Sequence, residues 1–477
     1  MKAGNIRRRE FTGALGAAAL APGCATRVQG DTTEMELVAQ PARALLRSAQ
    51  QPEVAVWTYG GTVPGPEIRV LQGARLRLHL LNKLSEETTV HWHGLRVPNA
   101  MDGVPHLTQH PIKPGERFTY EFSLPDAGTY WYHSHHRSAE QVERGLYGAF
   151  IVREPRPIQV DRELTWVLDD WRLTREGQIS QTFGHPHDMS HEGRIGNVVT
   201  VNGQAPQTLS VRRGERLRIR LINAANARIF GLKFDGHQPQ VIALDGQPVK
   251  PHEPAGGQIV LAPGMRADVV LDAMGEPGKR YAIGDVFYPR AAYDLLEIAY
   301  APLALRDQPL GSPIELTANP LAQPDLSAAQ THEIRFQGGM MGQLHSATLN
   351  GQMMNMMSLM RAGKAWAVNG VVAAGHESHA GHAGHAGLTL KRGRTYIFAF
   401  SNETRWHHPI HLHGHSFKVI RRNGQPTRHQ EWLDTVLMAP DERVDVAFVA
   451  DNPGDWMLHC HILEHQDGGM MSVFRVA

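Results

Sequence analysis

The sequence of 477 residues predicts an all-β protein made of three similar β-sandwich domains, and three observations lead to this prediction. Short runs that alternate apolar and polar residues, such as 75–81, 216–222 and 444–449, are separated by Gly, Pro, Asn and Asp, which is typical of strands and turns. Long stretches with apolar residues about every 3.6 positions are missing, so long helices are not expected. A two-part sequence element also recurs three times along the chain.

The recurring element predicts where the domains lie. Its first part is an alternating run that follows a Gly and ends in Asn, and copies occupy 69–82, 210–223 and, more loosely, 388–402. Its second part has Pro and Arg three residues apart before another alternating run, at 114–122, 263–271 and 440–448. Three copies in the same order predict domains at 35–157, 158–305 and 331–477, with a Pro-rich linker at 306–330.

The composition is that of an ordinary globular protein with an unusual amount of histidine. Because 48 Lys and Arg balance 47 Asp and Glu, the chain has no basic field for binding nucleic acid. Two cysteines exclude a disulfide framework and a thiolate-rich zinc or iron–sulfur site. The 28 histidines are therefore the residues on which we expect function to depend.

The first 30 residues predict an export signal. Arg7–Arg9 precede Phe11 and an Ala/Gly-rich apolar run at 14–22, which is too short to span a bilayer. The order of these residues resembles a twin-arginine signal, whose export machinery carries folded proteins. We therefore expect a periplasmic protein with no stable membrane span. Lipid anchoring at Cys24 is the less favoured alternative, because the preceding residues resemble a lipoprotein cleavage box only loosely.

Paired histidines mark the first and third copies of the repeat and are missing from the middle one. The pairs are His91 with His93, His133 with His135, His411 with His413, and His459 with His461. Alternate residues of a strand point to the same face, so each pair brings two imidazoles together. Imidazole suits Zn, Cu, Fe and Ni, and eight imidazoles exceed what one ion takes. We predict several metal ions held by the outer domains, with the middle domain as a spacer.

Cys460 predicts a second kind of centre. It lies inside the last His-x-His pair, so its thiol points to the opposite face from the two imidazoles. His408 and His465 can complete a set of two histidines and one cysteine, with Met470 as a weak axial ligand. This composition is typical of a blue-copper electron-transfer site.

The motifs together resemble the four ligand motifs of the multicopper oxidases. They read His-Trp-His-Gly from 91, Trp-Tyr-His-Ser-His from 131, His-Pro-Ile-His-Leu-His-Gly from 408, and His-Cys-His-Ile-Leu-Glu-His from 459, with Gly469-Met470 beyond. The similarity extends from about residue 50 to the end of the chain. It implies three cupredoxin-like Greek-key β-sandwich domains, with a trinuclear copper cluster between the first and the last.

The resemblance implies four copper ions per chain and assigns their ligands residue by residue. The type 1 copper is assigned to Cys460, His408, His465 and Met470. The type 2 copper is assigned to His91 and His411. The type 3 pair is assigned to His93, His133, His135, His413, His459 and His461. Because every ligand is retained, the resemblance argues against a scaffold that has lost its copper.

The implied reaction couples one-electron oxidation of a small reductant at the type 1 copper to four-electron reduction of O2 to water. Electrons are expected to pass through Cys460 to His459 and His461. Asp102 occupies a position where relatives keep an acid near the cluster, so we consider it as a proton donor. A role in an Asp102-Gly103 turn is the alternative. We expect a monomer.

Two segments indicate Cu(I) as the reductant. Seven of the 17 methionines lie between 340 and 360, and an Ala/Gly-rich run carries His376, His379, His382 and His385. Thioethers select Cu(I) and His-rich tracts bind Cu(II) or Zn, and copper-resistance members of the family carry such inserts near the type 1 site. Met353, Met356, Met357 and Met360 also have the spacing of one buried helix face, so core packing is the alternative for these four.

The sequence also leaves two alternative functions open, a phenol oxidase and a copper-sequestering protein. A laccase-like phenol oxidase needs an open groove beside His465 or His408, and no groove can be read from the sequence. Thr404 stands where some cuprous oxidases of the family have an acid, and Glu403 beside it is the nearest substitute. A periplasmic copper-sequestering protein without turnover is a third possibility, which the complete ligand set disfavours. The histidines of loop 185–191 are expected at the surface, with a metal site as the alternative.

Overall fold

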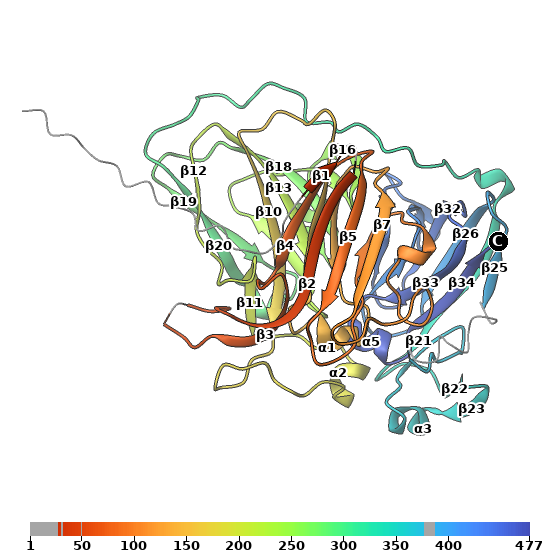
Figure 1. Ribbon diagram of the computed structural model, residues 1–477. Helices are drawn as coiled ribbons and strands as arrows, with labels where there is room; N and C mark the ends of the chain where they lie inside the picture. The colour runs from red at the N-terminus through yellow and green to blue at the C-terminus, as the bar shows by residue number, and fades with distance from the viewer. Residues whose placement is uncertain (1–26, 30–31, 49, 376–386) are drawn as a thin grey trace, which may run out of the picture.

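The computed structural model describes residues 27–29, 32–48, 50–375 and 387–477, which form three β-sandwiches (Figure 1). The first sandwich has one sheet of β1 (Arg27–Gln29), β2 (Thr32–Ala44), β3 (Val54–Tyr59), β5 (Arg75–Asn82) and β7 (Arg117–Ser123). Its other sheet consists of β4 (Gly65–Leu71), β6 (His91–His93), β8 (Gly128–His133) and β9 (Tyr147–Arg153).

In Figure 1 the second sandwich is drawn to the left of the first and the third to its right, and the second sandwich also contacts the third directly. One sheet consists of β10 (Arg162–Trp171), β11 (Val198–Val201), β13 (Glu215–Asn223), β15 (Gln240–Leu244), β16 (Gln247–His252) and β18 (Arg266–Ala273). The other consists of β12 (Leu209–Val211), β14 (Phe230–Phe234), β17 (Ile259–Leu261), β19 (Arg280–Asp285) and β20 (Tyr293–Tyr300). A loop of this sandwich carries helix α2 (Pro186–Ser190).

The third sandwich completes the molecule. One sheet consists of β21 (Gln330–Gly338), β24 (Trp366–Val368), β26 (Thr395–Asn402), β28 (Phe417–Arg422), β29 (Gln425–Pro426), β30 (Trp432–Leu433) and β32 (Arg443–Val449). The other consists of β25 (Leu388–Leu390), β27 (His408–Leu412), β31 (Thr435–Met438), β33 (Gly454–Cys460) and β34 (Met471–Val476). The hairpin β22 (Ser346–Leu349) and β23 (Gln352–Asn355) and helix α3 (Met356–Arg361) project from it. Among the described residues, the remaining α-helices are α1 (Ser138–Gln141) and α5 (Leu463–Asp467).

The same strand pairing occurs in each sandwich. The strand of the first repeat part (β5, β13 or β26) pairs antiparallel with the strand of the second part (β7, β18 or β32). It also pairs in parallel with the strand before it in the sheet (β2, β10 or β21). In the opposite sheets, β6, β14 and β27 pair antiparallel with β8, β19 and β33. The predicted all-β fold of repeated sandwiches is confirmed, whereas the exact domain limits stay predictions.

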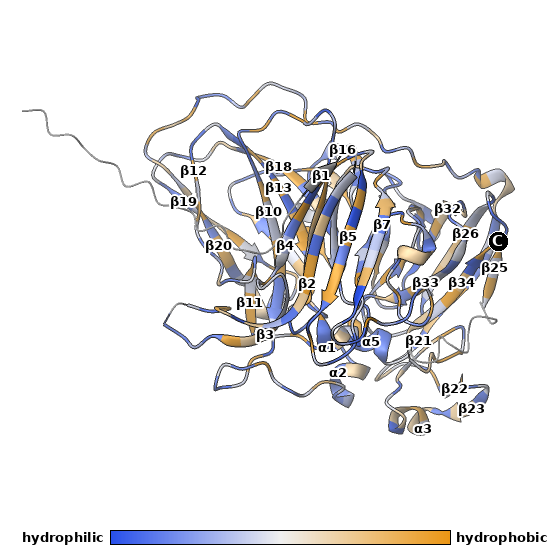
Figure 2. Ribbon diagram, in the orientation of Figure 1, coloured by the Kyte–Doolittle hydropathy of each residue, from blue (hydrophilic) through white to orange (hydrophobic). Residues whose placement is uncertain are grey.

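Alternation of side chains along the strands explains the core. On β5 the leucines at 76, 78 and 80 are fully buried, whereas Arg75, Arg77 and His79 between them face outward, and Figure 2 shows this banding along β2 and β5. Each sandwich has its own cluster of buried apolar side chains. Among the described residues, the helices are all too short or too polar to cross a membrane.

The middle sandwich departs from the alternating pattern because its outer face is covered. All nine residues of β13 are buried, including Arg218 and Arg220. Both arginines donate hydrogen bonds to Asp268, at 2.6 and 2.9 Å, and Arg220 also donates to Thr129 of the first sandwich at 2.8 Å. Arginines that are buried and charge-paired within the second sandwich therefore face the first sandwich, and Arg220 bonds to it.

Candidate metal centres

Four strands from two sandwiches bring the predicted histidines into one buried group. His91 and His133 are register partners on β6 and β8, and His411 and His459 are register partners on β27 and β33. The sandwiches meet where the rings of His93 and His411 stack with centroids 3.8 Å apart. We call this group, with all eight members buried, the histidine cluster: His91, His93, His133, His135, His411, His413, His459 and His461.

The cluster divides into sets of three nitrogens that lie within 4.8 Å of one another. One set is His93, His133 and His461, a second is His135, His413 and His459, and a third is His91, His93 and His411. Each set combines residues of the first and third sandwiches. The cluster therefore exists only where these two sandwiches meet, which no local pattern in the sequence specifies.

Backbone carbonyl groups determine which nitrogen faces the cluster in three of the rings. Nδ1 lies 2.8 Å from the Asp102 carbonyl in His91, 2.9 Å from the Ser134 carbonyl in His133, and 2.9 Å from the Asp434 carbonyl in His411. A carbonyl can only accept, so Nδ1 carries the proton in these rings and Nε2 carries the lone pair. The three Nε2 atoms are buried and have no hydrogen-bond partner among the described residues.

His93 has the opposite tautomer. Its Nε2 lies 3.1 Å from Asp434 Oδ1 and donates to that carboxylate, and its Nδ1 is buried without a hydrogen-bond partner in the described part of the chain. Burial lowers the pKa of His93, His133 and His461 well below the usual histidine range, and the nearby imidazoles lower it further. Neutral imidazoles with converging lone pairs are the state that a metal requires of its ligands.

Asp102 contacts the cluster directly. Its side chain is 1 % exposed, and its Oδ2 lies 2.8 Å from Nδ1 of His413. Its carbonyl oxygen accepts from His91, so one residue touches two rings of the cluster. The turn interpretation also has support, because Gly103 has φ of +83° and a Cβ there would lie 1.8 Å from the Val90 carbonyl oxygen.

The predicted second centre forms around Cys460. Sγ of Cys460 lies 3.5 Å from Nδ1 of His408 and 3.7 Å from Nδ1 of His465, and the two Nδ1 atoms are 3.1 Å apart. Met470 is fully buried, and its carbonyl accepts from the Cys460 N–H at 3.1 Å. We call these four residues the Cys460 centre.

Hydrogen bonds on the outer side of both rings direct Nδ1 toward the sulfur. Nε2 of His465 donates to the carbonyl of His191 at 2.7 Å. Nε2 of His408 donates to the Thr404 hydroxyl at 2.8 Å, because that hydroxyl already donates to Asn402. Burial lowers the pKa of His465 to about 3 and raises the pKa of the Cys460 thiol. A bound metal cation would instead lower the pKa of the Cys460 thiol, since a coordinating thiol is deprotonated.

The middle sandwich contributes to the cluster through Arg266, which the sequence analysis did not single out. Arg266 is fully buried and donates to both carboxylate oxygens of Asp434, at 2.8 and 2.6 Å. Asp434 in turn holds His93. The same position of the repeat carries Arg117 and Arg443 in the outer domains, whose side chains are 57 % and 47 % exposed. The arginine is thus common to all copies, and only the packing of the domains gives Arg266 its role.

The methionine-rich segment does not bury one continuous apolar face. Helix α3 begins at Met356, and Met353 lies on β23 instead. Met356 and Met360 pack against apolar cores, whereas Met353 and Met357 are 71 % and 67 % exposed. Core packing therefore holds for two of the four, because Met357 lies on the exposed side of the six-residue helix and Met353 lies outside the helix. The run with His376, His379, His382 and His385 lies outside the described residues.

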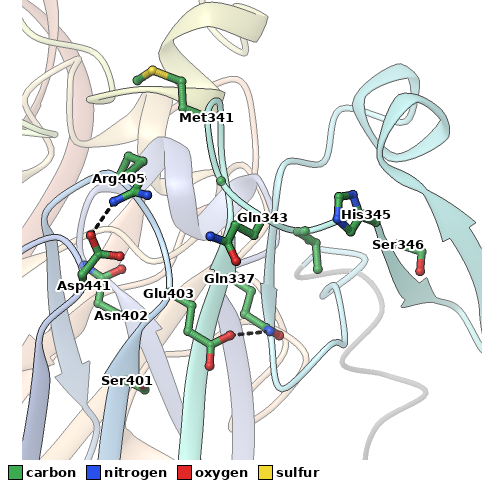
Figure 3. A pocket seen from close by; sticks show the side chains of 12 residues that line it. Gln337, Met341, Gln343, His345, Ser346, Ser401, Asn402, Glu403, Arg405 and Asp441 are labelled. Carbon is green, nitrogen blue, oxygen red and sulfur yellow. Dashed lines mark hydrogen bonds and ion pairs between the residues drawn. The ribbon is translucent and has the colours of Figure 1, made fainter.

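A cavity of about 580 Å³ opens between this segment and the third sandwich (Figure 3). Glu403 points into it and accepts a hydrogen bond from Gln337 at 2.7 Å, while Arg405 pairs with Asp441 at 2.5 Å. Thr404 rather than Glu403 holds His408. The geometry therefore does not support Glu403 in the role of the acid that some cuprous oxidases have at the position of Thr404.

Comparisons with known proteins place these features in context. Three family models described as multicopper oxidase match residues 43–157, 162–291 and 335–477. The chain is 32 % identical to the multicopper oxidase MmcO of Mycobacterium tuberculosis, over 92 % of this chain and 86 % of that protein. It is 26 % identical to copper resistance protein A of Escherichia coli, over 88 % of this chain and 89 % of the relative. The crystal structure of a multi-copper oxidase from Pseudomonas thermotolerans superposes with a TM-score of 0.79 at 35 % identity, covering 94 % of this chain and 99 % of that chain.

Proposed function

The chain belongs to the multicopper oxidase family and is an oxidoreductase, and on this basis we propose that its physiological reductant is Cu(I) and that it acts in copper tolerance. In this proposal the Cys460 centre would hold the copper that accepts one electron from each Cu(I), and the histidine cluster would hold the copper ions that supply four electrons to O2. The E. coli relative named as a copper resistance protein is consistent with this role.

One observation carries the choice of Cu(I): protein groups cover the outer nitrogen of both imidazoles at the Cys460 centre. The His191 carbonyl accepts from His465, and the Thr404 hydroxyl accepts from His408. An organic substrate therefore cannot hydrogen-bond to either ring. Met340 and Met341 are exposed, and the Met340 N–H donates to the carbonyl of Ser190, next to His191; thioethers favour Cu(I).

We propose the copper ligands residue by residue, with four ions per chain. For type 1 they are Cys460, His408, His465 and Met470. For type 2 they are His91 and His411. For the type 3 pair they are His93, His133 and His461 on one ion and His135, His413 and His459 on the other. The lone pairs on His91, His93, His133 and His411 that have no hydrogen-bond partner within the described ranges, and the grouping of the nitrogens in all the sets, support this assignment.

Copper, when bound, supplies the one-electron redox changes and the reduction of O2. The chain holds the lone pairs in place through the carbonyl groups described above, and it joins the two centres covalently, since Cys460 is peptide-bonded to His459 and His461. Asp102 is proposed as the proton donor, because its carboxylate lies 2.8 Å from the His413 ring and is shielded from solvent.

Oxygen uptake by the copper-loaded protein tests the proposed reductant. With Cu(I), we expect four Cu(I) consumed per O2, together with four protons, giving four Cu(II) and two waters. A simple phenol should support much slower uptake in the absence of added copper. Rapid turnover of the phenol with none for Cu(I) would refute the proposal.

A phenol oxidase is the second candidate, favoured by a cavity of about 180 Å³ lined by Tyr288, Trp406, His407 and Ile462. The cavity has aromatic walls, and Ile462 follows the cluster residue His461 directly. The comparison of Cu(I) with a phenol decides between the two candidates. Filling the cavity by Ala227→Leu should slow phenol oxidation and leave Cu(I) oxidation unchanged if both activities exist.

Export and the accessory segment are proposals of the same kind. We propose periplasmic location through the twin-arginine signal, which Arg8→Lys with Arg9→Lys should abolish, leaving the protein in the cytoplasm. We also propose that residues 376–386 and the exposed Met353 and Met357 collect copper. Deleting 376–386 should lower the rate of Cu(I) oxidation and leave the blue absorption band intact.

A further inference from the structure

A loop of the middle sandwich covers the Cys460 centre from outside. Met189 of helix α2 is buried in the core of the third sandwich, and its carbonyl accepts from the Trp366 indole at 2.5 Å. The carbonyl of Ser190 accepts from the Met340 N–H at 2.8 Å. This loop is therefore fixed against the third sandwich, and its side chains have defined positions relative to the copper ligands.

Two histidines of this loop stand on its outer face as a pair. His187 and His191 are four residues apart, and their rings stack with centroids 4.0 Å apart and an interplanar angle of 9°. Nδ1 of His191 donates to the His187 carbonyl at 3.0 Å, so its Nε2 carries the lone pair. His185, by contrast, uses its Nδ1 lone pair to accept from the His187 N–H.

Soft ligands lie beside the pair. Met340 and Met341 are 48 % and 65 % exposed, and the Met340 backbone is tied both to Ser190 and to the Trp406 indole, which donates to its carbonyl at 2.9 Å. The Trp406 ring lies 5.2 Å from the ring of His191. In Figure 3, Met341 extends beside the ribbon of α2. Imidazole and thioether together form a donor set suited to Cu(I).

His191 also connects this surface to the type 1 ligands. Its main-chain carbonyl accepts the 2.7 Å hydrogen bond from Nε2 of His465. An ion held by the ring of His191 is therefore separated from a type 1 ligand by one residue and one hydrogen bond. The other type 1 imidazole, His408, is covered by the Thr404 hydroxyl, which offers no soft ligand.

We propose that His187 and His191, with a thioether from Met340 or Met341, form the docking site for the substrate Cu(I). The inference rests on the proposed function, because it names where that substrate binds. Each docked Cu(I) loses one electron and leaves as Cu(II). With copper held at the Cys460 centre, the His191 main chain and His465 would be the path by which the electron reaches it. Four such electrons and four protons reduce one O2 to two waters.

Silver(I) binding and Cu(I) kinetics test the site on the copper-loaded protein. The double variant His187→Ala with His191→Ala keeps the main-chain carbonyl that holds His465, so the blue band should be unchanged. We expect it to lose one Ag(I) site in calorimetry and to raise KM for Cu(I) by about tenfold or more, with little change in kcat. His252 and His429 provide the matched control, because they are also stacked, at 4.5 Å, elsewhere on the molecule.

The two readouts separate this inference from the proposed function. Loss of Ag(I) binding in the His187/His191 variant but not in the His252→Ala, His429→Ala control supports a soft-metal site at this pair, and a raised KM for Cu(I) in the same variant supports its role as the docking site. If the wild-type protein binds Ag(I) there but oxidises no Cu(I), the proposed function fails and the metal site stands. Unchanged Ag(I) stoichiometry, or an unchanged KM in a protein that does oxidise Cu(I), overturns it. An equal change in the control variant also overturns it, since the effect would not be specific to this pair.

Discussion

Replacing Arg266 by Met should destabilise the histidine cluster, because Arg266 of the middle domain holds Asp434, which in turn holds His93. Arg266 is fully buried, contacts both oxygens of Asp434, and also donates to the Thr129 carbonyl at 3.2 Å. Removing one partner of a buried ion pair costs about 3–5 kcal/mol, because the other charge stays buried without compensation. We expect the free energy of unfolding of the copper-free protein to fall by about that amount.

The exposed pair of Arg280 and Glu297 is the matched control. It lies in the same sandwich and has a 2.7 Å contact, but its side chains are 60 % and 49 % exposed. Arg280→Met should therefore cost less than about 1 kcal/mol in the same denaturant titration. Equal losses for the two variants, or a loss below about 1 kcal/mol for Arg266→Met, would refute the reasoning. After copper loading, Arg266→Met should bind less copper in the cluster yet keep its blue band, since Asp434 holds His93 and not the Cys460 centre.

Three further predictions follow from single contacts. Asp102→Asn should slow O2 reduction by about 100-fold or more and alter its pH profile, while anaerobic bleaching of the blue band by Cu(I) stays fast; an unchanged pH profile would remove the proton-donor role. Thr404→Val leaves the Nε2–H of His408 without an acceptor and should destabilise the protein by about 1–3 kcal/mol in denaturant titrations, whereas a neutral effect would show that the bond is not needed. The copper-free protein should lose stability as the pH falls from about 6.5 toward about 3. Burial lowers the pKa of His465 to about 3 in the folded chain, so in this pH range the unfolded chain binds a proton that the folded chain does not. Unfolding midpoints that do not decrease between pH 7 and pH 5 would contradict this sign.

The fold could be predicted from the sequence because its signals are local. Alternation along the strands and the threefold repeat specify which residues face each core, as at 76, 78 and 80 on β5. The His-x-His pairs likewise specify which imidazoles share a face. The grouping of nitrogens into sets could not be predicted, because every set draws on both outer domains. The spacing of residues along one strand carries no information about the strand it will meet.

Interactions between domains account for what the sequence did not specify. The middle domain was predicted to be a spacer, yet its Arg266 reaches the cluster through Asp434, and its His191 carbonyl holds His465. Neither role has a local signature, because the first residue type recurs in every copy and the second interaction uses only the backbone. The methionine spacing predicted one helix face for Met353 to Met360, but α3 begins at Met356 and Met353 lies on strand β23.

The absorption spectrum and copper content of the loaded protein, measured side by side for the wild type and Cys460→Ser, test the central claim most directly. The account predicts four copper ions and an intense blue band in the wild type, and three ions with no blue band in the variant, because only the Cys460 centre is lost. A blue band that survives in Cys460→Ser, or a wild-type protein that binds copper without one, would contradict the assignment of the two centres.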